Sequence, residues 1–478
     1  MTLRKTKIVA TLGPSSSSEE MLARMITAGV NVVRLNFSHG SADDHIKRAE
    51  IVRAIAAKLN RPIGVLCDLQ GPKIRIGKFE FGEISLKMGD LFILDADCEL
   101  GTQDHVGLDY KTLPQEVKEG VVLLLDDGRI TMQVDRIKGN QIHCMVLSGG
   151  ILSNNKGINR QGGGLSADAL TKKDREDILT AVKLEADYIA ISFPKSAADV
   201  ELARSLVKKA GGTASIIAKI ERAEAIENLE AIIEASDAIM VARGDLGVEV
   251  GDAAVPGLQK RMIRMARAQN KLVITATQMM ESMISCPIPT RAEVSDVANA
   301  VLDGTDAVML SAETAAGQYP LETVQAVHRV VMEAEKEYLS QYHAQKLDEM
   351  FVRTDETIAA AAIYTAKHFK VKAIAALTQS GNAAQWLSRA DAEVPIYALS
   401  PDKYARRKLT LHRGVYPYPI SQDDKNRDEV LQEMEQVLLQ QKVVNPGDLV
   451  LLTFGEPIGS PGGTNTLKIV KIGSVKQG

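Results

Sequence analysis

Residues 216–221 read Ile216-Ile217-Ala218-Lys219-Ile220-Glu221, and residues 238–245 read Ala238-Ile239-Met240-Val241-Ala242-Arg243-Gly244-Asp245. Each segment begins with apolar residues, several of them β-branched, and ends in charged ones. This is the pattern of a buried parallel strand that delivers polar side chains to a site. Lys219 and Glu221 are two positions apart, so on a strand they point to the same side. With Asp245 at the end of the next strand, they indicate a divalent cation beside an anionic substrate, although a structural salt bridge would explain either segment alone.

The same strand pattern recurs along the chain, with helix-like segments between most of the strands. Strands are predicted at 7–13, 31–37, 63–69, 188–193, 214–221, 238–246, 271–278 and 307–313. Apolar residues at helical spacing predict helices at 19–28, 43–59, 174–184, 197–210 and 256–269, and a capping box at 290–293 predicts one more. Strand–helix alternation repeated eight times predicts an α/β protein with a (β/α)8 TIM barrel.

Two interruptions of this alternation divide the chain into three predicted domains. After Leu69 the sequence is rich in glycine and in short alternating strands, which indicates a small β-barrel domain inserted at 71–167. Residues 1–70 and 168–345 then form the catalytic barrel, close to the roughly 250 residues of a typical one. Residues 346–478 form a separate C-terminal α/β domain with a mostly parallel sheet. Its helices are predicted at 357–368 and 428–441, and its strands at 373–378, 395–400, 449–454 and 467–472.

The composition excludes several classes of protein. The chain has 478 residues, is 45% hydrophobic and 25% charged, and carries a net charge of -4. These values are ordinary for a globular protein and give no reason to expect nucleic acid. No apolar run approaches the roughly 18 residues of a membrane-spanning helix, and the apolar stretch at 8–12 is too short for a signal sequence. The four cysteines form no CxxC pair, so neither disulfides nor zinc are expected, and a cytoplasmic location is predicted.

Polar side chains gather at the predicted C-terminal ends of the barrel strands, where barrel enzymes have their active sites. Glu221 and Asp245 are hard oxygen ligands of the kind that Mg²⁺ prefers. The hydroxyls of Thr277 and Ser311 are suited to hold a water or to relay a proton. Guanidinium and ammonium groups suit phosphate oxygens, and the candidates here are Arg34, Lys73, Arg75 and Lys219. Taken singly, each of these residues also has a structural explanation, such as a salt bridge or a helix cap.

The motifs that contain these residues resemble those of pyruvate kinase, and the resemblance covers essentially the whole chain. It rests on 36–40 (Asn-Phe-Ser-His-Gly), 68–75, 217–221, 240–249, 277–283 and 309–319. The resemblance implies transfer of the phosphoryl group from phosphoenolpyruvate to ADP, giving pyruvate and ATP in the last step of glycolysis. It also implies a homotetramer, and no membrane or nucleic-acid partner is expected.

The resemblance assigns roles to individual residues. Glu221 and Asp245 match the ligands of a bridging Mg²⁺ (or Mn²⁺), and Lys219 matches the lysine that stabilises the transferring phosphoryl group and the enolate. Thr277 and Ser311 match hydroxyls linked to carboxylate binding and enolate protonation. The other matches are Ser192 near the phosphate, Gly244 and Asp245 as amide donors to the carboxylate, Arg34 on the phosphates, and His39, Arg75 and Lys156 near the nucleotide.

Lys73 departs from the pattern of many relatives, which need K⁺ and carry glutamate in a Gly-Pro-Glu-Ile-Arg motif. The residues that match the family's K⁺ site are Asn36, Ser38, Asp68 and the carbonyl of Leu69. An ammonium group at Lys73 would supply the positive charge that K⁺ supplies elsewhere. We therefore expect that K⁺ is not required; a Lys73 side chain that points to solvent is the alternative.

The inserted domain is the candidate lid. Phosphoryl transfer has to exclude water, because water competes with ADP as the acceptor. Hinges are predicted near Gly71-Pro72 and at 166–171. The run Gly162-Gly163-Gly164 is interpreted as a loop and not as a phosphate cradle.

The C-terminal domain resembles the family's effector domain. The segment 378–383 is a strand-to-helix turn suited to a phosphate, and its candidate ligands are Thr378, Ser380, Gly381 and Asn382. The loop at 459–465 is expected to close over it. This pattern indicates a sugar-phosphate or AMP activator; the alternative is an ordinary α/β turn without a ligand.

Two other kinds of function are open alternatives on the sequence. A phosphoenolpyruvate mutase or a class II aldolase is also a Mg²⁺-dependent barrel enzyme that acts on an enolate, but it would not need the inserted lid, Arg34 or Arg75. A non-catalytic paralogue would be expected to have lost Lys219, Glu221 or Asp245, and all three are present.

Overall fold

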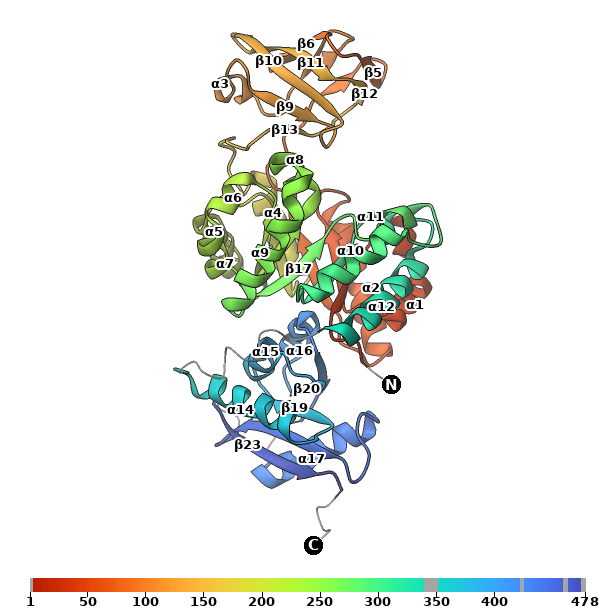
Figure 1. The fold of residues 1–478 in the computed structure, drawn as a ribbon, viewed down its shortest axis with the longest axis vertical. Coiled ribbons are helices and arrows are strands. Elements are labelled where there is room, and N and C mark those ends of the chain that lie inside the picture. The colour runs from red at the N-terminus through yellow and green to blue at the C-terminus, as the bar shows by residue number, and fades with distance from the viewer. Residues whose placement is uncertain (1–2, 339–350, 422–424, 459–462, 474–478) are drawn as a thin grey trace.

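The computed structural model describes residues 3–338, 351–421, 425–458 and 463–473, and its three parts are stacked along its longest axis. A β-rich part is at one end, a barrel surrounded by helices lies in the middle, and an α/β part is at the other end (Figure 1). The chain leaves the barrel after its third strand, forms the β-rich part, and returns to complete the barrel. The boundary predicted near 345 lies outside the described residues, and the domain limits remain predictions.

The central barrel is closed by eight parallel strands, as predicted. Around the barrel the strands follow the order β1-β18-β17-β16-β15-β14-β3-β2. Their bounds are β1 (Lys7–Thr11), β2 (Val32–Asn36), β3 (Gly64–Asp68), β14 (Tyr188–Ile191), β15 (Ser215–Ile220), β16 (Ala238–Ala242), β17 (Leu272–Ala276) and β18 (Ala307–Leu310). Because all neighbours pair in parallel, the C-terminal ends of the strands share one end of the barrel.

All eight predicted barrel strands extend past the observed C-terminal ends, and two of them run into a helix. β16 ends at Ala242, and α8 (Arg243–Val250) begins at the next residue. Glycine is poorly suited to a strand, and the Gly244 N–H donates to the Thr277 hydroxyl instead of continuing the sheet. Likewise β18 ends at Leu310 and is followed by α11 (Ala312–Ala315). Asp245 therefore lies in the first turn of a helix and not on a strand.

Helices cover the outside of the barrel (Figure 1). Besides α8 and α11 they are α1 (Glu19–Ala28), α2 (Ala42–Lys58), α4 (Lys172–Lys183), α5 (Ala197–Lys209), α6 (Ala223–Glu227), α7 (Leu229–Ala235), α9 (Val255–Ala268), α10 (Arg291–Leu302) and α12 (Pro320–Glu337), with 3-10 turns η1 (Pro14–Ser16), η2 (Asp252–Ala254) and η3 (Glu281–Ile284). The predicted capping box begins α10, since Thr290 and Glu293 bond to each other's backbone N–H. The largest apolar core lies between strands and helices. None of the helices in the described ranges combines the length and the hydrophobicity that a membrane crossing requires.

The inserted part is a β domain with its own apolar core. Its elements are β4 (Lys78–Phe79), β5 (Glu83–Leu86), β6 (Leu91–Asp95), β7 (Leu100–Gly101), β8 (His105–Gly107), α3 (Leu113–Glu116), β9 (Val122–Leu125), β10 (Ile130–Lys138), β11 (Gln141–Ser148), β12 (Gly150–Ser153) and β13 (Ile158–Arg160). The main sheet has the order β13-β9-β10-β11-β6-β8. It is open, which corrects the predicted small β-barrel: the edge strands β13 and β8 have three residues each and pair on one side only.

The C-terminal part contains the predicted, mostly parallel sheet, in the order β21-β20-β19-β22-β23. Its strands are β19 (Ala373–Leu377), β20 (Ile396–Ser400), β21 (Val415–Pro419), β22 (Leu449–Gly455) and β23 (Thr464–Lys471), and its helices are α14 (Thr354–His368), α15 (Asn382–Arg389), α16 (Lys403–Lys408) and α17 (Arg427–Gln440), with the 3-10 turn η4 (Leu409–Leu411). Only β23 runs antiparallel to its neighbour. β21 was not predicted because it contains two prolines; as an edge strand it tolerates them.

Buried ion pairs attach the C-terminal part to the N-terminal ends of the barrel strands. Asp306, just before β18, is bound by both Nη atoms of Arg389 in α15, and both side chains are at most 2% exposed. Asp187, just before β14, pairs with Arg407 at 2.7 Å. The C-terminal part thus covers the strand ends opposite to those that carry the candidate site.

Arg389→Ala should destabilise the protein strongly. Removing one partner of a buried pair leaves an uncompensated charge, which costs about 3–5 kcal/mol. The free energy of unfolding, measured by urea denaturation, should fall by this amount. Arg427→Ala is the matched control, because Arg427 pairs with Asp428 on the surface, and it should change stability by about 0.5 kcal/mol or less. Equally small losses for both variants would contradict the role given to Arg389.

Candidate active site

A continuous chain of ion pairs lies at the C-terminal ends of β2, β3 and β15. Arg34 Nε is 2.7 Å from Asp68 Oδ2, and Lys219 Nζ is 3.3 Å from Asp68 Oδ1. Lys219 Nζ is also 2.8 Å from Glu221 Oε1. Asp68 and Glu221 are each 1% exposed, so both carboxylates are buried. We call these four residues the ion chain.

The charges of the ion chain stabilise one another. Burial by itself would lower the pKa of Lys219, but the carboxylates of Asp68 and Glu221 raise it, so the ammonium group stays charged. Burial would raise the pKa of Asp68, and the charges of Lys219 and Arg34 lower it. Burial, together with the charge of Asp245, raises the pKa of Glu221 to about 7 against the opposing effect of Lys219. An additional cation beside Glu221 would therefore stabilise the ionised form of this carboxylate.

Asp68 has a role that sequence reasoning did not assign. It was matched to a K⁺ site, whereas in the structure it bridges Arg34 and Lys219. Thr11 was also missed: its hydroxyl accepts a hydrogen bond from Arg34 Nη1 at 3.0 Å. The only signal in the sequence was that Asp68 ends a predicted strand, because its partners become neighbours only when the barrel closes.

The turn after β14 orients both Lys219 and Glu221. Ser192 Oγ accepts a hydrogen bond from Lys219 Nζ at 2.7 Å and donates one to the Leu69 carbonyl at 2.7 Å. The next residue, Phe193, has φ of 58°, which is rare for an aromatic side chain. This conformation lets the Phe193 N–H donate to Glu221 Oε2 at 2.9 Å. Ser192, predicted near the phosphate, thus lies in direct contact with the ion chain.

Backbone strain marks the turn after β17. Thr277 and Gln278 have φ of 66° and 57°, and a β-branched residue in this region is strained by about 1–3 kcal/mol. The Thr277 hydroxyl accepts from the Gly244 N–H at 3.0 Å and donates to the Ala276 carbonyl at 2.6 Å. Buried Arg243 donates to the carbonyls of Ala276 and Thr277 and so stabilises the turn. The structure therefore brings Gly244 and Thr277 together, and Arg243 supports them.

Ser311 is held by the helix that follows β18. Its N–H donates to Glu313 Oε2 at 2.6 Å, and Glu313 Oε1 accepts from the Met280 N–H at 3.2 Å. Glu313 is 2% exposed. This carboxylate connects the ends of β17 and β18, which carry the two predicted hydroxyl residues.

Glu221 and Asp245 fit a magnesium ion that takes its other ligands from water and substrate. The charge of Asp245 contributes to the raised pKa of Glu221, so the two carboxylates are near enough to interact electrostatically. Within the described ranges, no group of three or more His, Cys, Asp or Glu side chains is arranged to hold a metal. Mg²⁺ is commonly bound by one or two carboxylates together with substrate phosphates. The donor set is therefore suitable for Mg²⁺ and unsuitable for a closed structural metal site.

Lys73 lies between the barrel and the inserted domain. Its Nζ is 3.2 Å from Asp245 Oδ1 and 4.0 Å from Asp127 Oδ1. These are its ion pairs in the part of the chain that the structure describes. The side chain is 27% exposed, so it does not simply extend into solvent.

The residues that match the K⁺ site bond to other partners. Asn36 Oδ1 accepts from the Ser38 N–H at 3.2 Å, and the Leu69 carbonyl accepts from Ser192. The ammonium group of Lys73 lies beside Asp245, and its replacement of K⁺ stays a prediction. The requirement for K⁺ itself remains a prediction.

The three residues predicted near the nucleotide lie apart from the ion chain. Arg75 Nη1 donates to the Asn155 carbonyl at 3.0 Å, and Lys156 pairs with Asp126 at 2.7 Å, both within the inserted domain. His39 is on an exposed turn after β2. No contact given for the described residues joins these side chains to Arg34 or Lys219, so their roles remain predictions.

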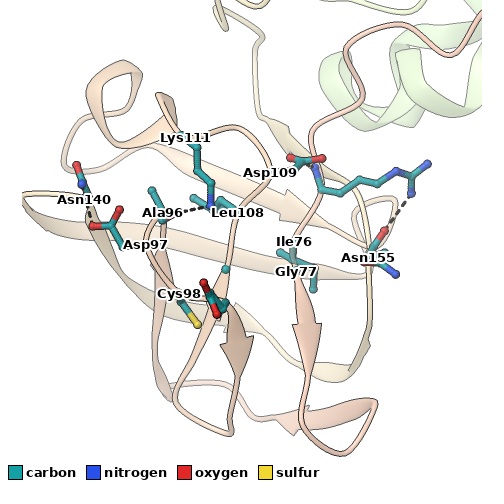
Figure 2. A pocket seen from close by; sticks show the side chains of 13 residues that line it. Ile76, Gly77, Ala96, Asp97, Cys98, Leu108, Asp109, Lys111, Asn140 and Asn155 are labelled. Atoms are coloured by element: carbon teal, nitrogen blue, oxygen red, sulfur yellow. Dashed lines mark hydrogen bonds between the residues drawn. The ribbon is translucent and has the colours of Figure 1, made fainter. Parts of the chain in front are cut away.

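An open pocket of about 700 Å³ lies in the inserted domain and includes Arg75 in its lining. Figure 2 shows that its polar side chains come from several loops and strands of this domain. The Lys111 ammonium group bonds to the Ala96 carbonyl at 2.5 Å, and Asn140 bonds to Asp97 at 2.9 Å. These polar groups are thus paired within the domain.

The predicted effector turn joins β19 to α15. Gly381 has φ of +96°, and its N–H donates to the Thr378 hydroxyl at 2.9 Å. Ser380 and Asn382 are exposed on the turn. Residues 459–462 of the predicted covering loop lie outside the described residues. The turn is a helix start with exposed polar groups, and its ligand remains a prediction.

The sequence was compared with known proteins. A family model for the pyruvate kinase barrel domain matches residues 3–324, and one for the pyruvate kinase alpha/beta domain matches residues 356–470. A pyruvate kinase of Haemophilus influenzae is 54% identical over 460 residues, which cover 95% of this chain and 96% of that protein. Pyruvate kinase II of Salmonella typhimurium is 52% identical over 478 residues, covering 98% and 99%. Together with the closed barrel and its ion chain, these matches show that the chain belongs to the pyruvate kinase family.

Proposed function

We propose that this chain is a phosphotransferase that moves the phosphoryl group of phosphoenolpyruvate to ADP and forms pyruvate and ATP in glycolysis. The observation that carries the proposal is the Lys219 ammonium group, held by two buried carboxylates at the open end of the barrel. Family membership supports the same reaction. A mutase or an aldolase is disfavoured, because the matched family domains account for most of the chain.

Charge neutralisation is the main task of the site. The transferring phosphoryl group spreads negative charge over its oxygens, and phosphoryl transfer depends on positioning and electrostatics rather than on covalent help. Lys219 and Arg34 supply two positive groups whose positions are set by Asp68. Because these groups are already oriented, little reorganisation is needed when charge develops.

Glu221 and Asp245 are the residues that would hold Mg²⁺ or Mn²⁺. When bound there, the cation would offset the negative charge of the substrate oxygens. The buried Glu221 is oriented by the Phe193 N–H, and the more exposed Asp245 faces the Lys73 ammonium group. The metal-binding carboxylates are thus fixed before the substrate arrives.

The bond changes follow from the substrates. The bond between phosphorus and the enol oxygen breaks as an oxygen of the ADP β-phosphate bonds to phosphorus. The enolate left behind takes a proton at its methylene carbon and becomes pyruvate. We assign the hydroxyls of Thr277 and Ser311 to carboxylate binding and to the proton path. In the present arrangement the Thr277 hydroxyl donates to Ala276, so it has to turn away from this carbonyl to donate to a substrate.

Lys219→Met should lower kcat by at least about a thousandfold, since a preorganised charge in a dry site is worth several kcal/mol. Pyruvate formation measured with and without ADP is the assay, and wild-type activity should require ADP. Lys209→Met, an exposed lysine of α5, is the control and should retain wild-type rates. Comparable activity of Lys219→Met, with circular dichroism showing a folded protein, would disprove the mechanism. ADP-independent pyruvate formation by the wild type would contradict transfer to ADP, because water would then be the phosphoryl acceptor.

Turnover is expected not to require K⁺, because Lys73 places a permanent ammonium group beside Asp245. Initial rates should be the same when K⁺ is replaced by tetramethylammonium at constant ionic strength. In Lys73→Met the fixed cation is absent, and the rate should become lower or dependent on K⁺. Loss of wild-type activity on K⁺ removal, with recovery on K⁺ addition, would refute this expectation.

Regulation and assembly follow the family resemblance. The chain is assigned to the cytoplasm as a homotetramer, and a sugar phosphate or AMP is the expected activator at 378–382. The exposed hydroxyl and amide at the start of α15 support an anion at this turn.

Ser380→Asp should abolish activation by placing a negative charge at the turn. Phosphoenolpyruvate titrations with a panel of sugar phosphates and AMP would measure this, and at least one compound should lower the half-saturating concentration of the wild type. Ser380→Ala is the matched control and should retain activation in part. An activator that acts equally on the wild type and on Ser380→Asp would place the effector site elsewhere.

A further inference from the structure

The segment that returns from the inserted domain is held by residues that closely follow Glu221. The Gly164 N–H donates to Glu224 Oε1. The Leu165 carbonyl accepts from Arg222 Nη1 at 3.2 Å. Arg222 is 5% exposed, so this contact is buried. The returning segment is therefore bonded directly to the turn that follows Glu221.

Glu249 joins the same turn to the helix that carries Asp245. Its side-chain Oε2 accepts from the Ala223 N–H at 2.9 Å. Its backbone carbonyl accepts from the Gly162 N–H at 3.2 Å. A single residue of α8 thus contacts both the turn after Glu221 and the returning segment.

The three consecutive glycines allow this close approach. Gly162, Gly163 and Gly164 have φ of +81°, +75° and +90°, a conformation that favours glycine. A Cβ at Gly163 would lie 2.6 Å from Glu224 Oε2. The remaining space is a cavity of about 20 Å³ lined by Gly163, Arg222, Glu224 and Glu249, among others, which has room for about one water molecule. Contact with the barrel thus explains Gly163, whereas a Cβ at Gly164 would meet Arg160 and one at Gly162 would meet nothing within 4 Å.

The outgoing segment makes a comparable contact with the other metal-binding residue. Lys73 follows the hinge at Gly71, and its ammonium group lies 3.2 Å from Asp245 Oδ1. Arg222 provides a second connection, because its guanidinium group lies 5.5 Å from the centre of the Phe193 ring. The Phe193 N–H in turn bonds to Glu221. Both connections to the lid therefore contact residues that orient Glu221 or Asp245.

We propose that Arg222 and Glu224 are positioning residues that clamp the segment 162–165 onto the barrel and couple the position of the lid to the orientation of Glu221. We call the side chains of Arg222 and Glu224, together with Gly162, Gly163 and Gly164, the return clamp. The clamp sets the angle at which the inserted domain stands over the barrel. The expected effect of the clamp on kinetics rests on the proposed function, but the contact between the segment 162–165 and the barrel does not.

Glu224→Ala should release the returning segment. Hydrogen exchange of peptides spanning 160–166 should become about tenfold faster, the scale expected for one lost charge-assisted hydrogen bond. The KM for ADP should rise more than kcat falls, because the lid is displaced while the ion chain is intact. Glu224→Gln retains an acceptor oxygen, so its exchange rate at 160–166 and its KM for ADP should be close to those of the wild type. Glu227→Ala, on an exposed position of the same helix α6, is the control and should match the wild type.

A double-mutant cycle separates the clamp from a general loss of stability. Gly163→Ala should accelerate exchange at 160–166 and raise the KM for ADP, because its Cβ would collide with the Glu224 carboxylate and alanine is strained at φ of +75°. In the Glu224→Ala background only the backbone strain is left, so the same substitution should have a clearly smaller effect. Equal effects in both backgrounds, or unchanged exchange in Glu224→Ala, would overturn the proposal. Since hydrogen exchange needs no turnover, this result stands even if the proposed reaction were wrong.

Discussion

The buried ammonium group of Lys219 is the charge on which the active end of the barrel depends. A charge removed from water is tolerated only when it is paired and hydrogen-bonded. Its partners Asp68 and Glu221 come from β3 and from the end of β15, which are not neighbours in the barrel. β14 lies between them, and Ser192 at its end bonds to Lys219. The pairing therefore requires β3, β14 and β15 to end at the same level of the barrel. Their parallel register meets this requirement.

The N-terminal ends of the barrel strands contact the C-terminal domain, and their C-terminal ends form the candidate site. At their N-terminal ends, Asp187 and Asp306 pair with arginines of the C-terminal domain. At their C-terminal ends lie the ion chain and the strained turns at Phe193 and Thr277. The strands that begin beside these two aspartates, β14 and β18, are buried throughout.

The inserted domain is joined to the site by polar contacts rather than by an extended apolar interface. Lys73 contacts Asp245 on the outgoing segment, and Arg222 and Glu224 bind the backbone of the returning segment. Hydrogen bonds and ion pairs of this kind can be exchanged for water with a small change in free energy. A domain held in this way is less restrained than one held by a large buried apolar surface.

The barrel, the polar residues at its strand ends and the pair Lys219 and Glu221 could be predicted from the sequence alone. These features are encoded by local periodicity, since two-residue and helical spacings act over a few neighbouring residues. The same local rules failed where a strand passes directly into a helix, as at Arg243, and where prolines sit on an edge strand, as in β21. Only the tertiary structure decided that Asp68 bridges Arg34 and Lys219, that Lys73 pairs with Asp245, and that Glu224 meets Gly164. These contacts join residues far apart in the chain, and their partners are set by closure of the barrel and return of the inserted domain, which no local spacing encodes.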